Sequence, residues 1–307
     1  MKIAAIGAGG FVGEALTRVL LAQCARDDRI VLIDQTPFAA PVDPRIETHL
    51  GSFADPNLRE SALDGADKVI LLASILGGAA EANYALSRQV NIDATLSLFE
   101  HLRDRNPKTR VVFASTIAVF AKPLPALVTD DTPTGLSIIY GAQKLMREVA
   151  LSNFAAKGWL DGVSVRPSGV MARPGADARL RTAFMSRLFH AIRDGEDITL
   201  PVHPDARTWI GSVDCVARNF VHAAHIASEA LGTHRAFTLP ALHVSFAELV
   251  EALHARFPQS SSRVEYAPDP ELVSLFGAYP ELETPIADRL GFSRDRDIDD
   301  LVNRAYV

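Results

Sequence analysis

The stretch Gly7-Ala8-Gly9-Gly10-Phe11-Val12-Gly13 decides the fold, because it joins a short apolar run to the start of a helical pattern. Its glycines fit the spacing GxxGxxG, whereas GxGxxG fails because valine stands at the last position. Glycines between a strand and a helix let the backbone turn tightly and approach a pyrophosphate, which then lies on the helix N-terminus. The alternative is a merely tight strand-to-helix turn, but the position, length and flanks of the stretch favour a dinucleotide site.

Outward from this stretch, the first two thirds of the chain alternate between two patterns. Short apolar runs predict strands, and apolar residues at helical spacing predict helices. The predicted strands are residues 2–6, 30–34, 68–72, 110–115 and 162–165, and the predicted helices are residues 11–25, 56–63, 80–103 and 138–157. The alternation predicts an α/β fold: a Rossmann-type doubly wound parallel sheet with helices on both faces.

A carboxylate closes the second predicted strand. Asp34 lies 21 residues after Gly13. At that place a carboxylate can accept hydrogen bonds from the ribose hydroxyls of adenosine, and it would repel a 2′-phosphate. No arginine follows Asp34 directly. The sequence therefore predicts NAD rather than NADP, and the alternative is an ordinary turn aspartate.

The pattern changes after Arg166, where prolines and glycines break the chain into shorter elements. Helical patterns recur at residues 211–228 and 245–257, and the second begins with a capping box of Ser245 and Glu248. We therefore expect an NAD-binding Rossmann domain at residues 1–165 and a smaller C-terminal substrate-binding cap mainly at residues 166–307. Segments near residues 205–230 are expected to return to the first domain.

Composition excludes several classes of partner. The 307 residues carry a formal net charge of −6 without a dense Lys/Arg cluster, so a nucleic-acid surface is not expected. No apolar stretch of about 18 residues predicts a membrane span. Cys24 and Cys215 lie in apolar helical patterns, which favours core thiols in a reducing, cytoplasmic compartment. His222 and His225 have a possible ligand spacing but no third ligand in pattern, so no metal is predicted.

Tyr140 and Lys144 lie four residues apart in a helical pattern and so share one face of the helix. Such a pair occurs often by chance. Alone, it does not distinguish a surface pair from a proton-transfer device.

Further motifs give the pair a context. Ser115-Thr116 closes a predicted strand, and two more segments are Leu71-Leu72-Ala73-Ser74 and Val90-Asn91-Ile92-Asp93-Ala94-Thr95. With GxxGxxG and Tyr140-x-x-x-Lys144, these segments make nearly the whole chain resemble the extended short-chain dehydrogenases/reductases, a family of NAD-dependent epimerases, dehydratases and dehydrogenases. The resemblance implies that Tyr140 takes the proton of a hydroxyl group, while Lys144 lowers the pKa of the phenol and binds the nicotinamide ribose.

Two roles implied by the resemblance stay open. Aligned on the family, Thr116 is the active hydroxyl, and Ser115 then points to the sheet interior or the helix beyond; Ser115 is the alternative. Asn91 either holds a water that relays protons from Lys144 or fixes backbone in its helix.

The same resemblance implies a set of NAD contacts. Ser52 stands where the family often has an aspartate that contacts the adenine amine, and serine can still form a hydrogen bond. The implied contacts are Gly7, Gly10, Phe11, Val12, Gly13, Asp34, Ser52, Phe53, Leu72, Ala73, Ser74, Tyr140, Lys144, Pro167 and Val170.

On the substrate side, Arg207 begins the segment RTWIGSVD, where extended members carry an arginine that grips a phosphate. A guanidinium binds carboxylate as well as phosphate. The segments "PVHPDARTWIGSVDCVARNFVHAA" and "APDPELVSLFGAYP" resemble a branch that oxidises the C2 hydroxyl of a four-carbon sugar acid. Arg207 would then hold the acid, assisted by Arg173 or Arg181; the alternative is that Arg207 pairs with a cap carboxylate such as Asp205.

Three functions follow from these observations. The first is an NAD-dependent dehydrogenase of a small sugar acid, with Tyr140, Lys144 and Thr116 as the proton-transfer set. The second is a UDP-sugar 4-epimerase on the same scaffold, and the third is a non-catalytic NAD-binding sensor, which has no need of a tuned phenol. A dehydratase is disfavoured, since the acid pair usual beside its active hydroxyl is missing. Family members commonly dimerise through the long helices, so we expect a homodimer.

Overall fold

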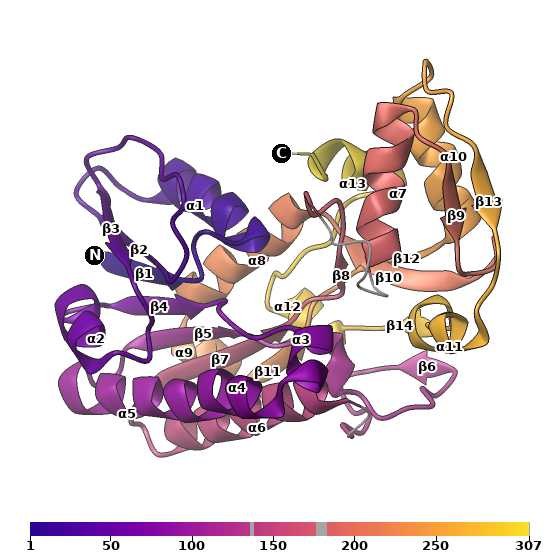
Figure 1. Cartoon of the computed structure of the whole chain (residues 1–307). Helices are drawn as coiled ribbons and strands as arrows, with labels where there is room; N and C mark the ends of the chain where they lie inside the picture. Colours follow the sequence, from indigo (N-terminus) through magenta and orange to yellow (C-terminus); the bar gives the residue numbers. More distant parts are fainter. Residues whose placement is uncertain (136–137, 176–182, 307) are drawn as a thin grey trace.

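The computed structural model describes residues 1–135, 138–175 and 183–306. In these ranges a central sheet of seven parallel strands has the order β11-β7-β5-β4-β1-β2-β3 (Figure 1). The strands are β1 (Lys2–Ile6), β2 (Arg29–Asp34), β3 (Ile46–Leu50), β4 (Lys68–Leu71), β5 (Arg110–Ala114), β7 (Asp161–Arg166) and β11 (Ala236–Thr238). The strand order reverses between β1 and β4, as in a Rossmann-type fold. The predicted fold class is confirmed.

Helices cover both faces of this sheet. On one face α1 (Phe11–Gln23) and α8 (Val213–His225) pack on side chains such as Ala5 and Val112. On the other face lie α2 (Pro56–Leu63), α5 (Thr95–Arg105) and α6 (Ile139–Ala156), packed on side chains such as Ala4 and Phe113. Successive side chains of a strand point to opposite faces, so burial on both sides explains why these strands are apolar throughout.

The helix predicted at residues 80–103 is interrupted at Asn83. The residues before Asn83 form α3 (Gly77–Ala82), and after it α4 (Tyr84–Arg88), the π-helical turn η1 (Gln89–Ala94) and α5 follow one another without a break. Asn83 ends α3 with φ −141° and ψ 82°, outside the helical region, and its side chain caps α4 by accepting the N–H of Leu86 at 3.0 Å. A capping side chain therefore overrides the apolar periodicity here.

The C-terminal elements gather around a second core, at the upper right of Figure 1. Its helices are α7 (Ala183–Asp194), α10 (Phe246–Arg256) and α13 (Ile298–Arg304). Its strands are β8 (Gly169–Val170), β9 (Ile198–Leu200), β10 (Arg207–Gly211), β12 (Leu242–Ser245) and β13 (Val264–Tyr266). The capping box of Ser245 and Glu248 is confirmed at the start of α10.

Shorter elements connect the two cores. They are η2 (Ile117–Val119), β6 (Leu127–Val128), α9 (Ser228–Leu231), α11 (Pro270–Leu272), η3 (Val273–Gly277), β14 (Glu281–Leu282) and α12 (Pro285–Arg289). β14 pairs with β6, so late and early parts of the chain meet. α8 packs on the central sheet and β11 extends it, so residues after the predicted boundary do rejoin the first core. The division at residue 165 stays a proposal.

Two expectations about surroundings stay predictions. None of the helices in the described ranges is long and apolar enough to cross a bilayer. The cytoplasmic location itself stays a prediction. The homodimer is also a prediction. α6 exposes 55% of Met146 and 63% of Val149, one helical turn apart, as a helix that packs against a second copy would.

Candidate active site

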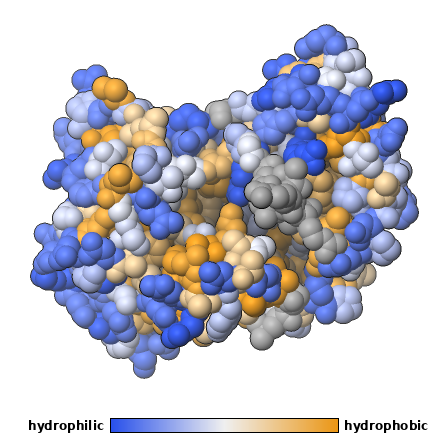
Figure 2. Space-filling model, in the orientation of Figure 1, coloured by the Kyte–Doolittle hydropathy of each residue, from blue (hydrophilic) through white to orange (hydrophobic). Residues whose placement is uncertain are grey.

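A cavity of about 690 Å³ opens at the carboxyl edge of the central sheet. Open parallel sheets bind ligands at this edge, where the strand order reverses. Figure 2 shows a hollow across the middle of the molecule, with apolar residues on its walls. Every residue predicted to contact the cofactor lines this cavity: Gly7, Gly10, Phe11, Val12, Gly13, Asp34, Ser52, Phe53, Leu72, Ala73, Ser74, Tyr140, Lys144, Pro167 and Val170.

The glycine turn is shaped for close backbone approach. Gly7 has φ +92°, and a Cβ there would lie 2.8 Å from the backbone N of Ala73. A Cβ on Gly13 would lie 2.3 Å from the carbonyl oxygen of Gly7. Gly10 is the N-cap residue of α1 and offers no side-chain cap, which leaves the helix N-terminus open to an anion. The turn therefore fits the pyrophosphate of a dinucleotide.

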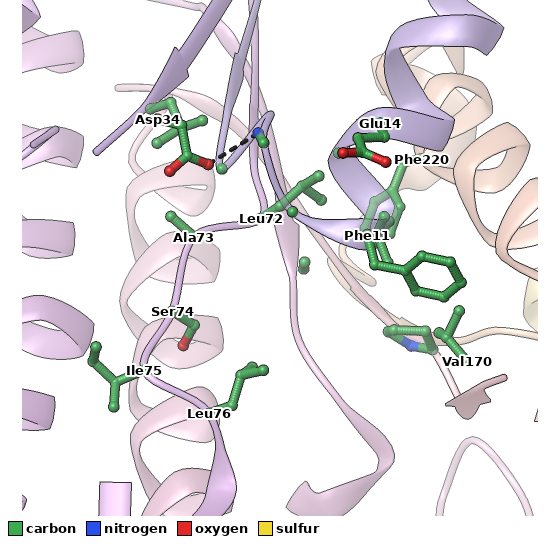
Figure 3. A pocket seen from close by; sticks show the side chains of 18 of the residues that line it. Phe11, Glu14, Asp34, Leu72, Ala73, Ser74, Ile75, Leu76, Val170 and Phe220 are labelled. Carbon is green, nitrogen blue, oxygen red and sulfur yellow. Dashed lines mark hydrogen bonds between the residues drawn. The ribbon is translucent and has the colours of Figure 1, made fainter. Parts of the chain in front are cut away.

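Asp34 is fixed beside this turn. Its Oδ2 accepts the N–H of Gly9 at 3.0 Å, the dashed line in Figure 3, and its Oδ1 accepts the N–H of Thr36 at 2.9 Å. Asp34 also lines the cavity, so its remaining lone pairs can accept hydrogen bonds from an adenosine ribose. The donor and acceptor chemistry of this end of the cavity fits a dinucleotide.

The reactive end of the cavity is formed by the start of α6 and the segment after β5. A Cβ on Gly141 would lie 2.3 Å from the carbonyl oxygen of Ala118, so only glycine lets α6 approach η2 this closely. The close approach places Tyr140 and Thr116 on the same wall of the cavity, and Thr116 acts to lower the pKa of the Tyr140 phenol. Thr116 Oγ1 also accepts the N–H of Ala118 at 3.2 Å, which fixes the threonine side chain.

Lys144 lies on the same face of α6, one turn below Tyr140. Its Nζ donates a hydrogen bond to the carbonyl oxygen of Ala114 and lies 5.4 Å from the centre of the Tyr140 ring. Burial, and then the like charge of Arg147, hold the pKa of the Lys144 ammonium well below its usual value. The Lys144 ammonium is therefore poorly stabilised by its protein surroundings.

The pKa of Tyr140 is raised by burial, and three neighbours oppose the rise. They are the charges of Arg147 and Arg173 and the hydrogen bond with Thr116. The lowering of this pKa by Lys144, whose Nζ lies 5.4 Å from the centre of the ring, stays a prediction.

Ser115 and Thr116 both line the cavity but face different surroundings. Ser115 is 3% exposed, and its Oγ has no hydrogen-bond partner among the described residues. The interaction with Tyr140 belongs to Thr116. This geometry favours Thr116 as the active hydroxyl.

Asn91 lies outside the cavity lining, in η1. Its Oδ1 accepts from the N–H of Ile75 at 2.8 Å and the hydroxyl of Ser74 at 3.0 Å. Its Nδ2 donates to the Ile75 carbonyl at 3.0 Å and to Gln143 at 2.7 Å. The Asn91 side chain thus fixes backbone by hydrogen bonds, as in one of the two alternatives. The backbone that it fixes belongs to the segment after β4 and not to its own helix. A role of Asn91 in a proton relay with Lys144 stays a prediction.

Of the two predicted substrate arginines that the structure describes, Arg173 reaches the cavity and Arg207 does not. Arg173 lines it, and its charge lowers the pKa of Tyr140. Arg207 lies outside the lining: its Nη2 donates to the His243 carbonyl at 2.9 Å and lies 3.4 Å from a carboxylate oxygen of Glu248. Arg207 thus pairs with a carboxylate of the cap, as in the alternative above, but its partner is Glu248 rather than Asp205. Arg207 and Glu248 face each other because they lie at the start of β10 and of α10. Arg181 falls outside the described residues.

Sequence patterns missed several residues around the cavity. Val216 and Phe220 of α8 line it from a distant part of the chain, and Glu14 lines it from α1. Arg147, on α6, does not line it, but its charge acts to lower the pKa of Tyr140. Its position seven residues after Tyr140 in one helical pattern could have indicated that Arg147 shares a helix face with Tyr140. No local pattern in the sequence of α8 indicates that its residues reach the cavity.

The described ranges contain no group of three His, Cys, Asp or Glu side chains that could hold a metal ion. His222 instead hydrogen-bonds the Leu290 carbonyl at 2.7 Å, and His225 the Val221 carbonyl at 2.8 Å. Burial raises the pKa of the Cys215 thiol to about 12, as for an inert core cysteine.

Comparison with known proteins shows which family the chain belongs to. The model of the "NAD dependent epimerase/dehydratase family" matches residues 3–235. The D-erythronate dehydrogenase of Haemophilus influenzae is 29% identical over 99% of this chain and 98% of its own length. The D-erythronate dehydrogenase of Cupriavidus necator is 30% identical over 100% of this chain and 98% of its own length.

A solved structure agrees in fold. The nucleoside-diphosphate-sugar epimerase of Agrobacterium tumefaciens superposes with a TM-score of 0.89 at 29% identity, covering 98% of this chain and 92% of its own. The chain therefore belongs to the NAD dependent epimerase/dehydratase family, and it is an enzyme of the extended short-chain dehydrogenase/reductase type.

Proposed function

We propose that this enzyme oxidises the C2 hydroxyl of a small sugar acid of the D-erythronate kind to the 2-oxo acid, with NAD as oxidant. One observation carries the proposal: Thr116, Tyr140 and Arg173 line the same dinucleotide cavity, and Thr116 and Arg173 both act to lower the pKa of Tyr140. A phenol, a hydroxyl and a guanidinium are the groups needed to deprotonate an alcohol beside a carboxylate. The full-length similarity to two D-erythronate dehydrogenases supports the acid substrate.

The chain's own residues divide the work. The Thr116 hydroxyl orients the C2 oxygen toward Tyr140, and the Tyr140 phenolate takes the hydroxyl proton. The guanidinium of Arg173 binds the carboxylate of the substrate and fixes which carbon faces the reactive end. The apolar wall residues exclude water from the reacting carbon. When bound, the nicotinamide supplies the acceptor for the hydride that leaves C2.

A UDP-sugar 4-epimerase is the second candidate, since the structural relative from Agrobacterium tumefaciens is described as a nucleoside-diphosphate-sugar epimerase. One panel separates the two functions: NADH formation with four- to six-carbon sugar acids, beside epimerisation of UDP-sugars. We expect absorbance at 340 nm to rise with D-erythronate and UDP-sugars to be inert. Activity on UDP-sugars alone would move the enzyme to the second function.

The cofactor preference follows from Asp34. Its carboxylate lines the adenosine end of the cavity and is held by two backbone N–H groups, so it cannot easily turn away from a 2′-phosphate. Repulsion between these charges predicts that NAD binds about tenfold or more tightly than NADP. Fluorescence titration of both cofactors measures the ratio, and a dissociation constant for NADP equal to or below that for NAD contradicts the role of Asp34.

Arg173 and Arg207 give opposite predictions for substrate binding. Arg173→Met should raise the KM for D-erythronate about tenfold or more, because a charge-assisted hydrogen bond to the acid is lost. Arg207→Met should leave KM within about twofold, since the guanidinium of Arg207 is engaged by Glu248 and the His243 carbonyl. Steady-state kinetics at fixed saturating NAD test both variants. The reverse ranking would return the acid-binding role to Arg207.

A further inference from the structure

The end of the cavity that lies farthest from Tyr140 is formed by the segment after β3. In the sheet, β5, β4, β1, β2 and β3 follow one another, and the cavity is lined by the segments after their carboxyl ends. Asp34 closes β2, and Ser52 and Phe53 follow β3. A dinucleotide with its nicotinamide beside Tyr140 and its pyrophosphate on the glycine turn would place adenine at Ser52 and Phe53.

Arg59 of α2 reaches back to this segment. Its Nη1 donates hydrogen bonds to the carbonyl oxygens of Phe53 and Ala54, both at 3.0 Å. Arg59 is 7% exposed and Phe53 is 6% exposed, so water competes little for the bond between them. Hydrogen bonds from a charged donor are about twice as strong as those between neutral groups. Arg59 therefore anchors two successive peptide groups of the cavity wall.

The peptide group between Phe53 and Ala54 is held on both sides. Its carbonyl oxygen accepts from Arg59, and its N–H donates to the hydroxyl oxygen of Ser52 at 3.2 Å. A serine hydroxyl that accepts one hydrogen bond keeps one donor and one lone pair, with which Ser52 can bind a purine base. Arg59 thus controls the position of the Ser52 hydroxyl through a single peptide group.

The start of α2 directs Arg59 toward this segment. Asp55 is the N-cap residue, its side chain accepts the N–H of Asn57 at 2.9 Å, and Pro56 occupies the first turn. The N–H of Arg59 donates to the Asp55 carbonyl at 3.1 Å, which places Arg59 one turn into the helix. Side chains of a helix point back toward its N-terminus, so the guanidinium returns to the residues just before the helix.

The guanidinium of Arg59 binds carbonyl groups and no carboxylate. In residues 1–135, 138–175 and 183–306 it forms no ion pair, and its buried Nε has no hydrogen-bond partner there. Burial lowers the pKa of Arg59, against the charge of Asp55, and burial and then the charge of Arg59 lower the pKa of His101. An apolar side chain would avoid the cost of burying a charge, which favours a role for the contacts with the two carbonyls.

We propose that Arg59 is a positioning residue for the cofactor, which holds residues 52–54 in the arrangement that receives adenine. Arg59 lies outside the cavity lining, so it acts through Ser52 and Phe53. The proposal concerns the dinucleotide and goes beyond the proposed function. It holds for any substrate that reacts at the other end of the cavity.

The test measures the binding of two cofactor fragments without turnover. ADP-ribose contains the adenine but not the nicotinamide, and nicotinamide mononucleotide contains the nicotinamide but not the adenine. Isothermal titration calorimetry gives the dissociation constant of ADP-ribose, and saturation-transfer NMR gives that of nicotinamide mononucleotide. Both are measured for the wild-type protein, Arg59→Met and Arg59→Lys.

We expect Arg59→Met to raise the dissociation constant of ADP-ribose about tenfold, because two charge-assisted hydrogen bonds no longer hold the segment. The value for nicotinamide mononucleotide should stay within about twofold, since its end of the cavity is untouched. Arg59→Lys keeps the charge on a shorter side chain and should raise the dissociation constant of ADP-ribose only about threefold.

Arg45→Met is the matched control. The Arg45 guanidinium likewise donates to two backbone carbonyls, of Cys24 at 2.9 Å and Leu21 at 3.0 Å, and it pairs with Asp43. Arg45 and these three partners lie outside the cavity lining. The loss of Arg45 should lower thermal stability and leave both dissociation constants at their wild-type values.

Two results would overturn the proposal. One is an unchanged dissociation constant of ADP-ribose in folded Arg59→Met or, where that variant does not fold, in Arg59→Lys. The other is equal weakening of both fragments, which would assign Arg59 to the stability of the whole domain. If ADP-ribose alone binds more weakly but no sugar acid is oxidised, the role of Arg59 holds and the proposed substrate fails.

Discussion

Tyr140→Phe should reduce kcat for sugar-acid oxidation by about 10²- to 10⁴-fold, the usual contribution of a general base. Phenylalanine keeps the ring that lines the cavity and loses the oxygen that takes the proton. The dissociation constant for NAD should stay within about threefold, because the glycine turn and Asp34 are untouched.

Stopped-flow and steady-state measurements of NADH formation, with NAD binding measured separately, check this prediction. Tyr84→Phe is the matched control, since Tyr84 lies on α4 and is 58% exposed. The control should retain wild-type turnover. An unchanged kcat in Tyr140→Phe, with NAD still bound, would show that another group takes the proton.

Thr116→Ala should have the second largest effect, a fall in kcat of about a hundredfold. It removes the hydroxyl that orients the substrate oxygen, and it removes a hydrogen bond that lowers the pKa of Tyr140. The pH profile should therefore also move upward, since the base form of Tyr140 appears only at higher pH. Thr116 also caps η2, so we expect a loss of about 1 kcal/mol in the free energy of unfolding.

Two neighbouring variants make this prediction specific. Thr116→Ser keeps the hydroxyl and should restore most of kcat. Ser115→Ala should change kcat less than threefold, because the Ser115 Oγ is buried without a partner in the described ranges. A larger loss in Ser115→Ala than in Thr116→Ala would exchange the roles of the two residues.

Much of the fold is predictable because burial on both sheet faces leaves a continuous apolar signature. Strands β1 and β4 match their predicted ranges to within one residue. The cavity contacts are predictable for a related reason: they follow the carboxyl ends of parallel strands, which meet at one edge. Motif positions such as Gly13 and Asp34 therefore converge although they are distant in sequence.

The missed features depend on partners that a sequence does not display. Asn83 interrupts a helix because its side chain caps the helix that follows. The side-chain amide of Asn91 forms hydrogen bonds with the segment after β4. Arg207 has the right motif position but faces Glu248 across the cap. Glu148 lies four residues after Lys144 on α6, but only the folded chain reveals that it pairs with Arg166.

The most direct test of sugar-acid oxidation follows the hydrogen on C2. D-Erythronate deuterated at C2 is incubated with the enzyme and NAD, and the reduced cofactor is analysed by mass spectrometry. The proposed function predicts one deuterium in the reduced cofactor and a 2-oxo acid as product, and both should form about 10²- to 10⁴-fold more slowly with Tyr140→Phe. Reduced cofactor without deuterium, or no reduction under conditions where NAD is bound, would contradict oxidation at C2.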